Sequence, residues 1–317
     1  MLSYVVWRLV SIVPTLFISS LIVFSVVRLI PGDAIDMLIS QMPEVGDPAV
    51  ARQRLEASLG LDQPMAKQYL LWIGNVLVGD LGQSIRFRTP VLDEITSRLP
   101  VTIELASWSL VFALLIALPI GIYSAIRQET VADHLARSFS MLAQATPGFW
   151  LGVLVVLLPA LWWGWSAPRY VPFAVSPWGN FRSLLLPALV LSFSSSAVIM
   201  RLMRTMMLEV LRQDYVRTAW AKGAGERRVV LRHALKNAMI PVITLIGILV
   251  PTLFGGTVII EQIFRLPGLG VLLIEAVSQR DYPIIQGVFL VAAVVVVLAN
   301  LAVDLCYGLL DPRVQHG

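Results

Sequence analysis

The sequence predicts an all-α integral membrane protein with six transmembrane helices. Of its 317 residues, 57% are hydrophobic and 14% are charged, whereas soluble domains carry about 25% charged residues. The apolar residues also gather in runs close to the ~20 residues that a helix needs to cross a bilayer core. Because lipid offers no hydrogen-bond partners to peptide groups, we expect each run to be helical.

The six expected spans follow one another along the whole chain. They are Leu9–Val27, Val101–Ile126, Ser138–Trp163, Leu184–Met200, Asn237–Ile260 and Pro283–Val303. The first resembles a signal peptide because Arg8 precedes it, but it lacks a small-x-small cleavage site and Arg28 follows it, so we expect a retained helix. Prolines 14, 119, 147, 187, 241 and 251 fall in or near the spans, where we expect kinks rather than breaks.

The orientation follows from the basic residues of the short connections. Nine Lys or Arg residues and three acids lie between Arg201 and Lys236, whereas the basic residues of the first connection are diluted by acids in a long loop. Short loops rich in Lys and Arg stay in the cytoplasm. We therefore expect both termini to be cytoplasmic.

These spans divide the chain into three expected parts. Residues 1–30 form an N-terminal transmembrane helix, residues 31–97 an external helical loop, and residues 98–310 the core. Ala49–Leu59 and Met65–Val78 in the loop have the pattern of short amphipathic helices separated by turn residues. Two interpretations stay open: a helical hairpin on the outer membrane surface, or a functional element that caps a translocation path or receives an external protein.

Residues that would indicate ion coupling, catalysis or cofactor binding are absent from the sequence patterns, which argues against these function classes. Glu104 is the one ionisable residue of the six expected spans, whereas ion-coupled transporters usually keep carboxylates or His near the mid-bilayer. No HExxH pattern, paired Cys/His spacing or Gly-x4-Gly-Lys-Ser/Thr loop occurs. We expect neither an enzyme nor a chain that binds a cofactor or metal. If the protein moves solute uphill, another subunit must supply the energy.

Small and polar residues of two spans are candidates for a translocation path, with close helix packing as the alternative. They are Ser192, Ser194, Ser195 and Ser196 of the fourth span and Thr252, Gly255, Gly256 and Thr257 of the fifth.

The basic connection 201–236 is too long for a plain helix–helix turn. Met203–Arg212 is expected to extend the fourth helix, Asp214 suits an N-cap, and Tyr215–Lys222 reads as a short helix stopped by Gly223. A further helix is expected from Glu226, with Arg228, Arg232 and Lys236 on one face. A short helix held between two long ones could dock a cytoplasmic partner, against the alternative of a solvated loop.

Motifs in this connection resemble those of binding-protein-dependent ABC importer permeases. They are Asp214-Tyr215-Val216-Arg217-Thr218-Ala219-Trp220-Ala221-Lys222-Gly223-Ala224 and Arg232-His233-Ala234-Leu235-Lys236-Asn237-Ala238. Other stretches agree in order along the chain, among them Arg28-Leu29-Ile30-Pro31-Gly32-Asp33, Gly79-Asp80-Leu81-Gly82-Gln83-Ser84, Phe264-Arg265-Leu266-Pro267-Gly268-Leu269-Gly270 and Asp311-Pro312-Arg313. More narrowly, the chain resembles the B-type permease subunit of dipeptide and oligopeptide importers.

The resemblance implies the type I ABC importer permease fold and a docking role for the basic connection. Anchored on Gly223, the family's Glu-Ala-Ala triplet falls on Arg217, Thr218 and Ala219, so the usual carboxylate is absent. The resemblance places the coupling to an ATPase on a short helix whose candidate residues are Asp214, Tyr215, Arg217, Thr218, Ala219, Ala221, Lys222 and Gly223.

The partners that the resemblance implies are a second, homologous permease subunit, two ATP-binding subunits that hold ATP and Mg, and an external solute-binding protein. We expect membrane lipid around the helices, no nucleic acid, and a place in a bacterial or archaeal cytoplasmic (inner) membrane. A small peptide is the expected solute, with nickel chelates, glutathione and oligosaccharides as alternatives. A scaffold or channel without an ATP-driven cycle is the alternative from a different class.

Overall fold

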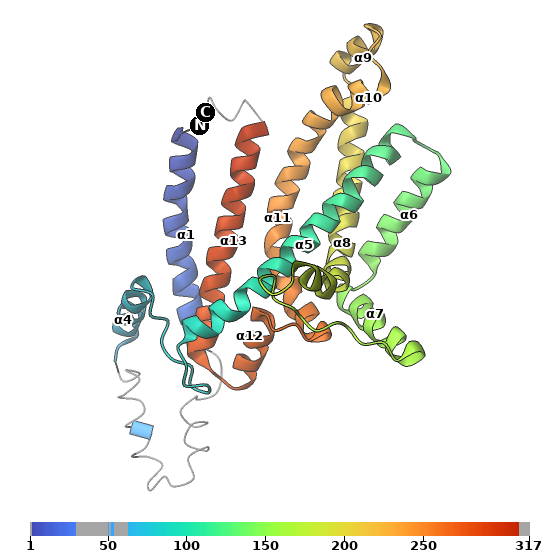
Figure 1. The fold of residues 1–317 in the computed structure, drawn as a ribbon. Coiled ribbons are helices and arrows are strands. Elements are labelled where there is room, and N and C mark those ends of the chain that lie inside the picture. Colours follow the sequence, from blue (N-terminus) through green and yellow to red (C-terminus); the bar gives the residue numbers. More distant parts are fainter. Residues whose placement is uncertain (1, 30–49, 51, 54–62, 311–317) are drawn as a thin grey trace. The chain divides into compact units, whose positions relative to one another are not determined.

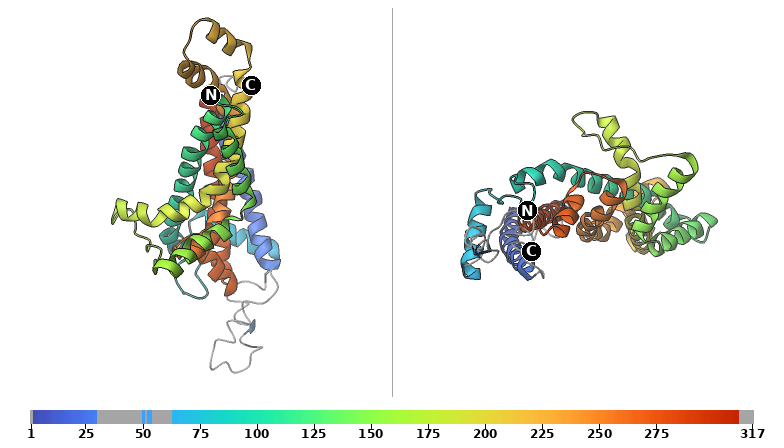
Figure 2. Two further views of the ribbon diagram at one scale, coloured as in Figure 1. Left: turned by 90° about the vertical axis from the view of Figure 1, so that its right-hand side faces the viewer. Right: turned by 90° about the horizontal axis from the view of Figure 1, so that it is seen from below.

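A computed structural model describes residues 2–29, 50, 52–53 and 63–310. The described residues are almost entirely helical, with a single isolated bridge between Gln83 and Pro90. The expected helix Ala49–Leu59 lies largely outside them. Figure 1 shows the helices along the chain, and Figure 2 gives two further views. By its internal contacts the chain divides into two compact units.

The described part contains five helices long and apolar enough to cross a membrane, or six if one bent pair is a single span. Five expected spans lie within the long helices α1 (Leu2–Leu29), α5 (Val91–Ile126), α8 (Pro177–Leu211), α11 (Leu235–Phe264) and α13 (Tyr282–Leu310). Pro14, Pro187, Pro241 and Pro251 lie inside their helices, as expected.

The third expected span, Ser138–Trp163, is not one straight helix. It falls on α6 (Val131–Ala145) and α7 (Gly148–Trp163), which are bent by 94° relative to each other. Thr146 is extended, with φ −89° and ψ 120°, because the ring of Pro147 disfavours helical geometry in the preceding residue. The expectation of a kink at Pro147 was therefore wrong: the helix breaks there.

The first unit comprises residues 1–8, 101–270 and 296–317. In it, α8 packs against both α11 and α6, and α7 packs against α8 and α11. Small residues contribute to the same core: Ala113 and Ala117 of α5 and Ala197 of α8 are fully buried in one cluster. Met200, Met203 and Met207 fill the space between α8 and its neighbours. The core of this unit thus runs along α8.

The second unit comprises residues 9–100 and 271–295. It holds most of α1, the amphipathic helix α4 (Met65–Leu77), the start of α5 and the start of α13. α4 agrees with the expected helix Met65–Val78. Asp281 fixes the turn that follows α4, because its carboxylate accepts hydrogen bonds from Ser84 Oγ (2.5 Å), Ile85 N (3.3 Å) and Arg86 N (3.2 Å).

Glu104 is the one acidic or basic residue of the expected spans, but the helices extend further than the apolar runs and contain two more buried carboxylates. Asp133 of α6 and Glu261 of α11 are both fully buried. Glu261 accepts hydrogen bonds from Thr102 Oγ1 (2.6 Å) and from the backbone N–H of Gly270 (2.7 Å). Both of its oxygens therefore hold the turn between α11 and α12 (Leu269–Ser278) against the start of the second span.

Glu104 itself is held by Tyr170, from the segment between α7 and α8, and by Asn180, in the first turn of α8. Its Oε2 accepts hydrogen bonds from Asn180 Nδ2 (2.7 Å) and Tyr170 Oη (3.0 Å). Burial, together with the hydrogen bond to Glu104, raises the pKa of Tyr170 to about 12. Tyr170 therefore stays protonated and remains a donor at physiological pH.

Candidate functional site

The short helix α9 (Asp214–Ala221) lies in the connection between α8 and α11. It begins one residue earlier than expected. Gln213, with φ −72° and ψ 148°, is the N-cap and makes no side-chain capping bond, so the expectation of Asp214 as the N-cap was wrong. Asp214 is the first helical residue and pairs with Arg217 at 3.5 Å. This pair is highly exposed, and such pairs contribute little to stability.

The C-terminal end of α9 is a Schellman motif. The N–H of Gly223 donates to the Trp220 carbonyl at 2.9 Å, and the N–H of Ala224 donates to the Ala219 carbonyl at 3.2 Å. Gly223 has a φ of +78°, a left-handed conformation that glycine adopts without steric cost. The expected stop at Gly223 is therefore confirmed, with Lys222 as the C-cap.

α9 has one anchored side and a larger exposed surface. Val216 is fully buried, and Tyr215 Oη accepts a hydrogen bond of 2.7 Å from Asn237 Nδ2 at the start of α11. The other candidate residues of α9 are open to solvent, with Ala219 partly buried: Asp214, Arg217, Thr218, Ala219, Ala221, Lys222 and Gly223. In Figure 2 (left), α9 projects beyond the ends of α8 and α11. Its surface is thus available to a second protein.

The connection from α9 back to the membrane contains a π-helical turn. α10 (Glu226–Arg228) passes into η1 (Val229–Ala234), which continues into α11. Val229 and Ala234 are fully buried in this turn. The helix expected from Glu226 is therefore present, but its second turn is π-helical and not α-helical. The side chains of Arg228, Arg232 and Lys236, expected on one face, are all exposed.

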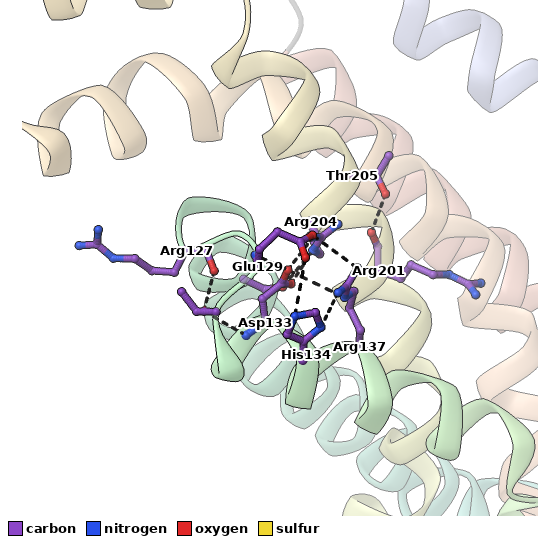
Figure 3. Close-up of polar contacts among 10 residues, drawn as sticks. Arg127, Glu129, Asp133, His134, Arg137, Arg201, Arg204 and Thr205 are labelled. Atoms are coloured by element: carbon purple, nitrogen blue, oxygen red, sulfur yellow. Dashed lines mark hydrogen bonds and ion pairs between the residues drawn. The ribbon is translucent and has the colours of Figure 1, made fainter.

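A buried ion pair ties together the three helices beneath this connection. Arg204 of α8 donates from Nε to Asp133 Oδ1 (2.8 Å) and from Nη2 to Asp133 Oδ2 (2.9 Å). Ser124 of α5 also donates to Asp133, and Arg204 Nε lies 3.0 Å from the Ser124 hydroxyl. Figure 3 shows Asp133 pointing toward Arg204 between these helices. A bidentate pair of this kind fixes the orientation of the two side chains as well as the distance between them.

Sequence reasoning missed this cluster because its members are far apart in the chain. One local signal was present: Thr130 is the N-cap of α6 and accepts from the N–H of Asp133, a Thr-x-x-Asp pattern. Exposed pairs surround the cluster, among them His134 with Glu129 and Arg137 with Glu129. Arg127, after the end of α5, also pairs with Glu226 of α10 at 3.7 Å. The α5–α6 turn is thus linked both to α8 and to the connection that carries α9.

The candidate path residues differ in exposure. Ser192, Ser195, Ser196 and Thr257 are buried. The hydroxyls of Ser192, Ser196 and Thr257 donate to carbonyls three residues earlier in their own helices, at 2.7–2.9 Å. A Cβ on Gly256 would lie 2.8 Å from Leu191 Cδ1 of α8, so this glycine permits close packing. Ser194, Thr252 and Gly255 are exposed and are therefore the members of the set that a solute or a partner could reach.

The candidate site combines an exposed short helix with a buried ion pair. Among the described residues, no group of three His, Cys, Asp or Glu side chains could hold a metal ion. The exposed helix α9 is held by the buried Val216 and by the hydrogen bond of Tyr215 to Asn237. The buried ion pair of Arg204 with Asp133 lies near the C-terminal end of α8. Such an arrangement suits the transfer of movement from a bound protein to the membrane helices.

Comparison with known proteins identifies the family. Residues 117–316 match the binding-protein-dependent transport system inner membrane component family, and residues 1–106 match the N-terminal family of the same membrane components. The chain therefore belongs to the permease subunits of binding-protein-dependent ABC importers. It is a multi-pass inner membrane protein and, like its relatives, a permease subunit and not an enzyme.

Named relatives cover the whole chain. It is 38% identical over 340 aligned positions to the dipeptide transport system permease protein DppB of Escherichia coli K12, covering 100% of this chain and 99% of the relative. It is 37% identical over 320 positions to the oligopeptide transport system permease protein AppB of Bacillus subtilis, covering 100% of both. These matches confirm the resemblance to the dipeptide and oligopeptide permease branch.

A solved structure supports the fold. An amino acid ABC transporter crystallised with histidines is similar with a TM-score of 0.50 and 15% identity, covering 70% of this chain and 94% of that chain. At this identity the likeness concerns the fold alone. It confirms the expected type I importer permease fold.

Proposed function

We propose that this chain forms half of the translocation path of an ATP-driven importer, and that α9 is its contact with an ATP-binding subunit. The observation that carries the proposal is the exposed, glycine-terminated α9 projecting from the ends of α8 and α11. Its contact surface would comprise Asp214, Tyr215, Arg217, Thr218, Ala219, Ala221, Lys222 and Gly223. The small residues Thr218, Ala219 and Ala221 would let α9 sit in a groove of the partner.

The proposed complex contains four kinds of subunit. This chain pairs with a second, homologous permease, two ATP-binding subunits hold ATP and Mg, and an external solute-binding protein delivers the solute. A solute that a membrane must exclude needs polar surroundings, which two six-helix bundles provide between them more easily than one. Closure of the ATP-binding subunits would move α9, and through it α8, so that the path opens alternately to each side.

The proposed orientation has both termini in the cytoplasm. It puts α9 on the side where ATP is available, and it puts the segment 31–97 outside, where it can cap the path or receive the solute-binding protein. The core of the proposed path lies within residues 98–310. Its lining would draw on Ser192, Ser194, Ser195, Ser196, Thr252, Gly255, Gly256 and Thr257.

We propose a small peptide as the solute. The support is the similarity to proteins named as dipeptide, di/tripeptide and oligopeptide transport permeases. The test is uptake into proteoliposomes that contain this chain and the subunits that co-purify with it. We expect uptake of a labelled dipeptide that requires ATP and the external solute-binding protein. Uptake without ATP, or recovery of the chain as a lone active subunit, would overturn the proposal.

A further inference from the structure

Helix α4 carries apolar side chains that no other part of the described chain covers. Leu77 and the following Val78 are 80% and 81% exposed, and Leu70 is 66% exposed. Leu70 and Leu77 are seven residues apart and so lie two turns apart on one face. Gly74 lies between them, and a Cβ added there would meet no atom within 4 Å. This face is a continuous apolar strip on a helix of the segment expected to be external.

α4 is fastened to the transmembrane helix α1 by a buried polar contact. Ser20 Oγ donates to the Phe17 carbonyl at 2.7 Å and lies 2.8 Å from Tyr69 Oη. With its proton directed to Phe17, Ser20 is left to accept a hydrogen bond from Tyr69. Ser20 and Tyr69 are both buried. Figure 1 and the right-hand view of Figure 2 show α4 beside α1.

Aromatic rings surround this hydrogen bond. The Tyr69 ring packs edge-on against Phe17, with centroids 6.3 Å apart, and against Phe24, with centroids 5.3 Å apart. Trp72, one turn further along α4, lies 5.7 Å from the Phe24 ring. Aromatic residues with one polar atom favour the boundary between lipid and water. The composition of the contact thus fits the edge of a bilayer.

The position of the contact along α1 gives the depth of α4. The apolar span of α1 runs from Trp7 to Val26, and Ser20 lies six residues before its end. At 1.5 Å per residue, Ser20 is roughly 9 Å inside the span. Phe17 is about one turn deeper. A helix whose Tyr69 reaches this level cannot lie wholly in the aqueous phase above the membrane.

We infer that α4 is a membrane-interface helix, and that the face bearing Leu70 and Leu77 contacts lipid acyl chains of the outer leaflet. Interfacial helices bury an apolar face about 5–10 Å into the boundary between headgroups and acyl chains, which agrees with the depth set by Ser20. The face also continues a lipid-facing surface, since Phe17, Ile18 and Ile22 of α1 are exposed along the same span.

The other flank of α4 has the opposite character. Gln68 and Asn75 are seven residues apart, and the Gln68 amide donates to the Gln63 carbonyl at 2.7 Å. Asn75 is exposed. In the first turn, Lys67 precedes Leu70 by three residues, and its Nζ donates to Gln63 Oε1 at 3.0 Å. Beyond that turn, α4 places Leu70 and Leu77 on one flank and Gln68 and Asn75 on the other, as a helix lying in the plane of an interface requires.

The test uses nitroxide labels on single cysteines. Cys306 is the only cysteine of the chain, so Leu70→Cys, Leu77→Cys and Asn75→Cys are made with Cys306→Ser and cysteine-free partner subunits. The complex is reconstituted into liposomes, and collision with oxygen and with a water-soluble nickel chelate is measured by electron paramagnetic resonance. The three positions lie on the surface of α4, so the label displaces no packed core side chain.

We expect labels at positions 70 and 77 to collide with oxygen and to be protected from the nickel chelate by at least about tenfold relative to position 75, because acyl chains exclude polar solutes. Equal access of the chelate to all three labels would overturn the inference and place the apolar face in water. Protection of positions 70 and 77 from both reagents would also overturn it, because a protein surface and not lipid would then cover the face.

Discussion

Arg204 of α8 and Asp133 of α6 form a bidentate ion pair, with N–O distances of 2.8 and 2.9 Å. The two residues are 71 positions apart in the sequence. The Asp133 side chain is fully buried, and the Arg204 side chain is 19% exposed. The pair joins α6 to α8, and α8 leads directly to α9. We infer that this ion pair couples α6 to α8, so that a displacement of α9 moves both helices.

Asp133→Asn should lower the free energy of unfolding, because it leaves the guanidinium of Arg204 without its carboxylate partner. Loss of one partner of a buried pair costs about 3–5 kcal/mol, and partial exposure of Arg204 places the expected loss near 3 kcal/mol. Thermal unfolding of the purified complex measures the effect. Glu129→Gln is the matched control, since Glu129 is 73% exposed and its pairs should contribute little. Equal unfolding temperatures for the two variants would contradict the assignment.

Gly223→Asp should abolish ATP-driven uptake while leaving membrane insertion intact. The added side chain has space within the chain, so the variant should fold, but it strains a φ of +78° and places a charge on the proposed contact surface. Gly225→Asp adds the same group two residues further on, at a φ of −66° where Asp is a favoured N-cap. Uptake by proteoliposomes is the measurement. Normal uptake by the Gly223 variant would show that this surface has no docking role.

The outcome at α9 shows what the sequence can predict. Its boundaries came within one residue, because an acidic residue at the start and a glycine after the last turn are local signals of a short helix. The break at Pro147 was misjudged because a proline near a span can either kink or end a helix, and the extended conformation of Thr146 decides between them. No local pattern signals the π-helical turn Val229–Ala234 or the pairing of Asp133 with Arg204. Both depend on which helices pack together.

Asp281→Ala should loosen the turn after α4. The carboxylate of Asp281 accepts from Ser84 Oγ, Ile85 N and Arg86 N, and hydrogen bonds to a charged group contribute about 1.5–3 kcal/mol. We expect faster amide hydrogen exchange at Ile85 and Arg86, measured by mass spectrometry of the intact complex. Asp93→Ala, at an exposed position of the same unit, is the control. Unchanged exchange in the Asp281 variant would contradict the role given to this residue.

Gly270→Ala should destabilise the turn that Glu261 holds. A Cβ there would lie 2.4 Å from the backbone Cα of Val258, and overpacking of this kind costs about 1–3 kcal/mol. Gly255→Ala in α11 provides the comparison, because a Cβ there meets nothing within 4 Å and Ala favours a helix by up to ~1 kcal/mol over Gly. The unfolding temperature should therefore fall for Gly270→Ala and rise or stay unchanged for Gly255→Ala. A Gly270 variant as stable as the Gly255 variant would contradict the packing described here.

The contact of α9 with an ATP-binding subunit is the central claim, and site-specific photocrosslinking in native membranes tests it most directly. A photoreactive amino acid replaces Ala219, and the same amino acid at Trp178, an exposed position before the fourth span, serves as the control. The account predicts a crosslink from position 219 to an ATP-binding protein, identified by mass spectrometry, and none from position 178. If position 219 crosslinks to other proteins but to no ATP-binding protein, the proposed contact of α9 is contradicted.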